Sequence, residues 1–481
     1  MKKAIAGFLI LLVGSITGFS YWEGILTEKQ WRLLLERAAS SLPPGQTSTT
    51  YHRGWFSSSS EFRLKLLSDE EPVVSKGDDV PEELMLSHTL VHGPLPIIEI
   101  VKGRAPLRPI MAIVHTRIAM KGRPFQRRTA RREEIPEGRI DTILNLDGGG
   151  SSDILVPPFT STGDTKREFL VSKELRGTIV FTKGAQEVSS QVQWGGAEMT
   201  IRDVRVTLGK MTSAFTYRSV TDQLAVWKNV ISLGALRVAW SPKGKEEITL
   251  RNLNFVASQE TKEGNLELHS LSRVKEIMVR GQQLGSLLLE LSLHHLDPSA
   301  MAMLSKLEST AGRLKGSWSR EAIKTMKNRQ MDKIFAAILR KSPALDMRFQ
   351  WGATKGVFNA SAKASFDGSD ETRVKNPALW PTGIEADALI SIPVALMSDD
   401  HGQPADTAVP SGTGNPGNGT PAVSSLPPLT TLLSRRGFNS SAESVFLARN
   451  GDLMESHLTY RRGHVLVNGW PLELLMQRAR E

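Results

Sequence analysis

The sequence predicts an α+β fold, made mainly of long, antiparallel, bulged β-sheets wrapped around a few helices and preceded by one N-terminal transmembrane helix. Three observations support this class. Apolar and polar residues alternate over much of the region from about 175 to 296, as they do in half-buried antiparallel strands. A pair of helix-like segments follows near 298–342, and residues 4–22 carry no charge.

The uncharged N-terminal stretch predicts a membrane anchor. Lys2 and Lys3 precede nineteen residues, Ala4 to Trp22, which are enough to cross a bilayer as a helix. A cleaved secretory signal is the alternative, but its apolar core is usually shorter, and Tyr21 and Trp22 suit the outer interface of a span. Because the lysines lie ahead of the run, the N-terminus is expected to stay cytoplasmic and the rest of the chain to be exported.

Composition limits the class of protein. The chain has 481 residues, no cysteine, a formal net charge of +10 and a pI near 9.6. The missing cysteines exclude disulfides, thiolate zinc sites and a cysteine nucleophile. The basic surplus favours anionic partners such as lipid headgroups or other envelope components, and export argues against nucleic acid.

After the anchor, Thr27 and Gln30 resemble a helix capping box, and Pro43 ends the predicted helix. This helix lies either on the membrane or on the first sheet, and the second is favoured. Residues 56–66 alternate strictly and predict a half-buried strand, whereas acidic residues with Pro and Gly predict a loop over 68–82. A second strand over 84–92 ends where the chain reaches Gly93-Pro94.

Within the strand-rich region the apolar alternation slips by one residue at three places. The slips lie at Arg202-Asp203, Arg251-Asn252 and His294-His295, and each is interpreted as a β-bulge. Three bulges indicate long strands that bend around either an apolar ligand or the protein's own helices. Coverage of the sheet by the helices is favoured.

The helical pair begins at Asp297-Pro298, an N-cap acid followed by proline at the first helical position. Ala300, Met303, Leu304 and Leu307 form the expected apolar stripe of the first helix, and the methionines of both helices are expected in the core. The second helix is expected over 319–342, followed by strands over 345–366 and 384–397. Residues 401–428 are predicted to be disordered. The end is predicted as a strand over 453–460, a turn at 462–463, a strand over 464–467, the Asn468-Gly469 turn and a helix over 472–480, whose Leu474 and Leu475 are available for packing.

The predicted organisation has five segments. They are an N-terminal anchor (1–26), an N-terminal helix with a β-rich part and a basic insertion (27–170), a β-rich body with the helical pair near 298–342 (171–400), a disordered linker (401–428) and C-terminal strands with a helix (429–481).

Several short motifs, taken in order, resemble one known family. They are Tyr21 to Gly24 after the anchor, Arg53-Gly54-Trp55-Phe56-Ser57, His92-Gly93-Pro94-Leu95, Leu296-Asp297 and Val467-Asn468-Gly469. Together they are similar to the YdgA-like family, bacterial domain of unknown function 945, over nearly the whole chain. The resemblance implies a β-rich body anchored in the inner membrane of Gram-negative bacteria, with the bulk of the chain in the periplasm. It implies no reaction and no catalytic residues.

Two stretches depart from the family pattern as insertions, namely 402–427 and a basic stretch at 117–132. The basic stretch is either a membrane-facing patch or a solvated loop, and the loop is favoured. A third feature, Asp147-Gly-Gly-Gly-Ser-Ser-Asp153, lacks the spacing and lysine of a phosphate-binding loop, so we interpret it as a flexible turn.

The sequence predicts no catalytic, cofactor-binding or metal-ligating residue. His294, His295 and Asp297 could contribute to a metal site, but adjacent strand residues point to opposite faces, so a structural or exposed role is favoured. His92 is expected to be a hydrogen-bonding residue at a strand end rather than a base.

Whether the protein is an enzyme is left open, with the balance against it. The favoured function is a non-enzymatic binding or structural role in the cell envelope. Its candidate partners are a lipid, a protein or a second copy of the chain. The alternative is a hydrolase of envelope polymers whose site is assembled from distant residues.

Overall fold

The computed structural model divides into two compact units, which are described separately. Unit 1 comprises residues 1–282 and 296–338, and unit 2 comprises 283–295 and 339–481. The structure describes residues 28, 47–54, 56–65, 83–94, 96–121, 137–162, 169–201, 203–221, 224–240, 246–314, 320–397 and 446–478. The anchor, most of the helix expected after Thr27 and the linker at 401–428 lie outside these residues. Of the described helices, none is both long and apolar enough to span a membrane.

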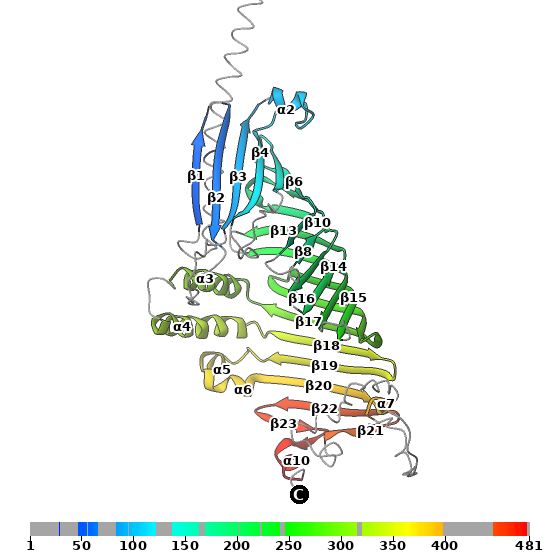
Figure 1. The fold of residues 1–481 in the computed structure, drawn as a ribbon. Helices are drawn as coiled ribbons and strands as arrows, with labels where there is room; N and C mark the ends of the chain where they lie inside the picture. The colour runs from blue at the N-terminus through cyan, green and yellow to red at the C-terminus, as the bar shows by residue number, and fades with distance from the viewer. Residues whose placement is uncertain are drawn as a thin grey trace, which may run out of the picture. The chain divides into compact units, whose positions relative to one another are not determined.

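Unit 1 begins with six strands that pair antiparallel, each with its neighbour in sequence (Figure 1). They are β1 (Thr47–Arg53), β2 (Ser57–Lys65), β3 (Glu83–His92), β4 (Ala112–Lys121), β5 (Gly138–Leu144) and β6 (Gly150–Val156). Between β3 and β4 the chain forms the short helix α2 (Ile97–Val101). Leu90, Met111, Ala112, Val114 and Leu144 form a buried cluster on one side of this sheet.

The sheet continues from β6 in the pairing order β6–β9–β10–β13–β14–β15–β16, and the strands are longest from β14 to β16. Their bounds are β9 (Leu175–Phe181), β10 (Glu187–Trp194), β13 (Met211–Thr221), β14 (Leu224–Trp240), β15 (Glu247–Lys262) and β16 (Asn265–Val279). A branch of shorter strands, β7–β8–β11–β12, joins the far end of β14. These are β7 (Phe159–Thr162), β8 (Phe169–Ser172), β11 (Ala197–Ile201) and β12 (Val204–Leu208). A single turn of 3-10 helix, η1 (Lys183–Ala185), links β9 to β10.

The helical pair of unit 1 forms where the sequence predicts it. α3 (Pro298–Leu314) starts at Asp297, whose Oδ1 accepts the Ala300 backbone N–H at 2.8 Å, and α4 (Arg320–Leu339) follows. Ala300, Leu307 and Ile334 form a buried cluster between the helices. Met331 packs against that cluster, as expected. Met303 is 53% exposed, so the prediction that it lies in the core is wrong.

Unit 2 is a second antiparallel run, β17–β18–β19–β20–β22–β23–β24, with β21 also paired to β22. The strands are β17 (Gln282–Leu296, of which 283–295 belong to this unit), β18 (Ala344–Ala353), β19 (Gly356–Phe366), β20 (Ile384–Pro393), β21 (Ala448–Asn450), β22 (Leu453–Arg461), β23 (His464–Val467) and β24 (Trp470–Pro471). The helices are α5 (Glu371–Lys375), η2 (Pro377–Leu379), α6 (Trp380–Gly383), α7 (Val394–Met397) and α10 (Leu472–Arg478).

Most predicted elements are confirmed, including the C-terminal meander and its helix, but four interpretations need correction. The basic stretch is not simply a loop, because its first residues, 117–121, belong to β4; residues 122–132 lie outside the described part. The glycine-rich segment is a turn only up to Gly149, since β6 starts at Gly150. Residues 394–397 are helical rather than extended. Leu475 packs at 5% exposure, whereas Leu474 is 50% exposed.

The three slips of the apolar pattern coincide with a hairpin and with left-handed residues rather than with β-bulges. The first slip falls where β11 meets β12 as a hairpin, because Ile201 pairs with Val204. Asn252 has a left-handed φ of 51°, yet β15 keeps one register with both β14 and β16 across it. His295 has a φ of 57° just beyond the last residue pair of β17 and β18. A left-handed residue disturbs the extended alternation as an inserted residue does, so the apolar pattern cannot distinguish the two.

Candidate functional site

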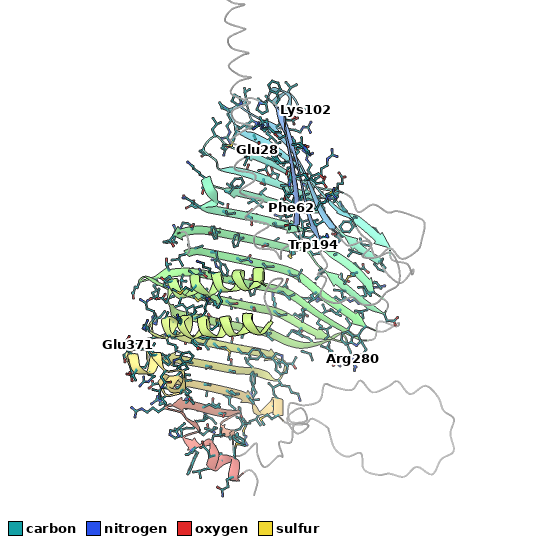
Figure 2. The ribbon with its side chains drawn as sticks, turned by 90° about the vertical axis from the view of Figure 1, so that its left-hand side faces the viewer. Glu28, Phe62, Lys102, Trp194, Arg280 and Glu371 are labelled. Atoms are coloured by element: carbon teal, nitrogen blue, oxygen red, sulfur yellow. The ribbon has the colours of Figure 1, made fainter. Side chains whose placement is uncertain are left out.

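An apolar strip crosses β9, β10, β13, β14 and β15 in unit 1. The register places Phe181, Val188, Tyr217 and Trp227 in one row, and further rows on the same side add Val192 with Ile231 and Trp194 with Leu233. We define the apolar strip as Ile179, Phe181, Val188, Val192, Trp194, Met211, Phe215, Tyr217, Trp227, Ile231, Leu233 and Phe255. Trp194 is labelled in Figure 2.

The strip is not buried. Its members are half-buried, and Phe255 is 39% exposed. Among the described residues of β9 to β16, the one buried apolar side chain is Leu266. Helix α3 contacts β14, but the described helices leave the strip half-exposed, so the favoured expectation that helices cover the sheet does not hold for it. Apolar patches of this extent on a soluble surface usually mark a binding site.

The opposite side of the same strands is more polar, although Val180, 53% exposed, lies on it. Gln191, Gln193, Thr216 and Lys228 are exposed there, one residue away from strip members. A cavity of about 440 Å³ lies over β9, β10, β13, β14 and β15 and takes most of its lining from this polar side. Its charged lining residues are Glu187, Arg218, Lys228 and Glu260, which balance one another. The cavity therefore offers no net charge to a ligand, and it shares Phe181, Val188, Tyr217 and Trp227 with the strip.

Unit 2 repeats the two-sided pattern. The register aligns Leu289 with Phe349 and Ile390 on one side, and Leu291 with Met347 and Leu458 beside them. Leu289 and Leu291 are 38% and 36% exposed. The other side carries charged and polar side chains along the same strands: Glu290, Arg348, Asp346, Lys363, Asp387 and His457.

A buried polar row occupies the core side of the first sheet. It consists of Ser58, Ser60, His88, His92, Thr116, Thr142 and Ser152, each no more than 9% exposed. His92 Nε2 lies 2.8 Å from Ser58 Oγ, and His88 Nδ1 lies 2.8 Å from Thr116 Oγ1. Burial lowers the pKa of His88 to about 4; burial, and then the nearby positive charge of Arg53, lower the pKa of His92. Both imidazoles are therefore neutral at pH 7.

The Ser58–His92 pair resembles a nucleophile and its base only in composition. Ser58 and His92 are 4% and 3% exposed, so a substrate cannot reach the hydroxyl without opening the sheet. Nδ1 of His92 has no hydrogen-bond partner among the described residues, and thus no carboxylate there orients the ring. The expected role of His92 as a hydrogen-bonding residue at a strand end is confirmed by its geometry.

An acid–histidine cluster lies on the other side of β4, next to α2. His115 Nδ1 is 2.6 Å from Asp141 Oδ1, and His115 Nε2 is 3.5 Å from Glu99 Oε2. Glu99 also forms ion pairs with Arg104 and Lys102, at 3.0 and 3.6 Å. Burial raises the pKa of Asp141, but hydrogen bonds from Arg139 and His115 outweigh it and lower that pKa overall. The cluster fastens the α2 loop to the sheet.

The remaining sequence candidates do not converge. His294 pairs with Asp346 at 3.2 Å, His295 Nδ1 lies 3.3 Å from the Ser342 carbonyl, and Asp297 caps α3. Across the described residues, no group of three His, Asp or Glu side chains is arranged to hold a metal.

The acid–histidine cluster was not predicted from the sequence, because the members of the cluster come from separate segments. Only the pairing of β4 with β5 brings His115 opposite Asp141, and no spacing in the sequence reveals that pairing.

Comparison with known proteins adds one result. No curated protein and no solved structure matches the chain. A family model described as "Bacterial protein of unknown function (DUF945)" matches residues 1–474. That match confirms the resemblance seen in the ordered motifs, and the chain belongs to this family of bacterial proteins.

Proposed function

We propose that the chain is a non-enzymatic, membrane-anchored periplasmic protein that binds an apolar chain of an envelope lipid on the apolar strip. One observation carries the proposal. Strands β9 to β16 place large apolar side chains on one side, yet Leu266 is the one buried apolar side chain among their described residues. Leaving such an area in water is unfavourable by roughly 25 cal/mol per Å² of apolar surface, so an occupant that covers it gains that free energy.

The dimensions of the strip suit a lipid chain. The strip crosses five neighbouring strands, β9, β10, β13, β14 and β15. At about 4.8 Å between neighbouring strands it extends for about 19 Å. The hydrocarbon core of a bilayer is about 30 Å thick, so the chains of one leaflet extend for about half of that. One acyl chain can therefore lie wholly on the strip.

The envelope location is part of the proposal and rests on the sequence. The uncharged residues 4–22 after Lys2 and Lys3 support a single span of the inner membrane with the body in the periplasm. The net charge of +10 supports a protein that works beside anionic lipids. Tethering would keep the strip close to the lipid that it binds.

Photo-crosslinking from two adjacent residues tests lipid binding. A benzophenone amino acid replaces Phe215, a strip member, or Thr216, which is exposed on the polar side of the same strand. Both full-length variants are irradiated in the cell envelope and then purified for intact mass measurement. We expect adducts of lipid mass at position 215 and none at 216.

Three other outcomes would overturn this function. Adducts at neither position would mean that the strip is empty. Equal adducts at both positions would mean unspecific contact with detergent or lipid. A crosslink from position 215 to protein would identify another chain, or a second copy, as the occupant.

A further inference from the structure

We infer that the loop containing α2, residues 97–110, is a membrane-docking loop that inserts Val101 and Leu107 into a bilayer rich in anionic phospholipid. Val101 and Leu107 are 81% and 87% exposed, the highest values among the exposed large apolar side chains of the described residues. They lie six positions apart in one loop at the end of β3 and β4 (Figure 1). Almost nothing in the described protein contacts either side chain.

A neighbouring turn adds to the same surface. Arg108 Nη2 donates to Asn145 Oδ1 at 3.0 Å, which joins the loop to the turn between β5 and β6. The next residue of that turn, Leu146, is 49% exposed. Three aliphatic side chains thus project from two loops that are joined to each other.

The loop is held in place and does not depend on a partner for its shape. The Arg104 backbone N–H donates to the Glu99 carbonyl at 2.8 Å, and the Ile110 N–H donates to the Pro94 carbonyl at 3.0 Å. Ile110 is fully buried, and the Glu99 carboxylate is held by Arg104, Lys102 and His115. The exposed aliphatic side chains are therefore fixed on the outside rather than free to fold inward.

The charge of the loop indicates which kind of surface it binds. The loop carries Lys102, Arg104 and Arg108, and its one acid, Glu99, is 6% exposed. The Lys102 and Arg104 side chains keep 50% and 42% of their surface exposed, and Lys102 is labelled in Figure 2. The joined turn adds one exposed acid, Asp147, so the bases outnumber the exposed acids by three to one. Aliphatic tips beside an excess of basic side chains match a bilayer, whose anionic headgroups meet the bases while the tips reach the acyl region. A docked protein would instead need a pocket for each projecting tip.

This inference rests on the proposed membrane location but not on lipid binding by the strip. Because the chain has no cysteine, one introduced cysteine gives a single labelling site. Full-length Val101→Cys and Leu107→Cys carry an environment-sensitive fluorophore and are reconstituted in nanodiscs. One set contains phosphatidylcholine, and the other an equal mixture with phosphatidylglycerol. Lys183→Cys, in the exposed η1 turn, is the matched control.

We expect a blue shift, and quenching by nitroxide-labelled lipid, at positions 101 and 107 in anionic nanodiscs, with neither at 183. Lys102→Gln added to Leu107→Cys should reduce the quenching. Labels at 101 and 107 that stay in water in both bilayers would overturn the inference, as would equal quenching at 183. Equal quenching in neutral and anionic nanodiscs would overturn the assignment to anionic lipid. Crosslinking at position 215 reports separately on the strip, so the two proposals can fail independently.

Discussion

At the residue scale, the histidines of the buried polar row make the stability of the folded chain depend on pH. His88 is 5% exposed and hydrogen-bonded to Thr116, and its pKa falls from 6.5 to about 4 because burial disfavours the imidazolium. The unfolded chain therefore binds more protons than the folded chain between those two values. By linkage, the stability present above pH 6.5 is lost as the pH falls towards 4.

The loss of stability at low pH should be measurable in the strands around β3. A pKa difference of about 2.5 corresponds to about 3 kcal/mol, fully expressed only near pH 4, and the lowered pKa of His92 acts in the same direction. Hydrogen-exchange protection of peptides from β2 to β4, corrected for intrinsic exchange rates, should fall between pH 7 and 4.5. His88→Asn can keep the bond to Thr116 but cannot be protonated, so its decline should be smaller. An unchanged decline in that variant would assign the pH dependence to other groups.

At the element scale, α3 shows a helix start that depends on one side chain. Asp297 Oδ1 accepts the Ala300 N–H at 2.8 Å, and Pro298 follows it. Replacing an N-cap acid with alanine typically costs about 1 kcal/mol. We expect Asp297→Ala to speed hydrogen exchange in the first turns of α3. Asp332→Ala, at an exposed position inside α4, is the control and should leave exchange in α3 unchanged. Equal effects of the two variants would contradict the capping role.

Elements were predictable from the sequence where local chemistry decides them. Asp297-Pro298 and Gly93-Pro94 mark boundaries without reference to the rest of the chain, and the alternation after Phe56 identifies both faces of β2. The slips were misinterpreted because one left-handed residue, such as Asn252, alters the pattern as an insertion does. The acid–histidine cluster depends on the pairing of strands from separate segments, which no local pattern encodes.

The apolar strip was also only partly predictable, because local sequence patterns do not encode contacts between distant segments. Alternation over about 175–296 predicts that these strands have one apolar side, and the register places Val192 and Phe215 together on that side. Alternation cannot reveal whether that side is covered. Covering depends on which other elements pack against it, and the same pattern serves a core sheet and a ligand-binding sheet.

At the scale of the whole molecule, both units place most of their large apolar side chains on one side of an antiparallel run and most polar ones on the other. Buried apolar clusters are found in the first sheet and between α3 and α4. The long strands of β9 to β16 contribute one buried apolar residue among those described. A protein whose stability needed the strip as its core would bury it, so the half-exposed strip fits an occupant better than it fits folding alone.

A charge placed on the strip tests whether lipid is that occupant in the full-length protein. Val192 is a half-buried strip member, and Gln193, next to it in β10, is exposed on the polar side. Aspartate at position 192 would hold an unpaired carboxylate against an acyl chain, which is costly without a hydrogen-bonding partner. We expect Val192→Asp to lose most of the lipid that co-purifies in native mass spectrometry, and Gln193→Asp to retain it. Protection of β10 amides from hydrogen exchange, measured without added lipid, checks that Val192→Asp is folded. Equal lipid content in the two folded variants would show that the strip is not where lipid binds.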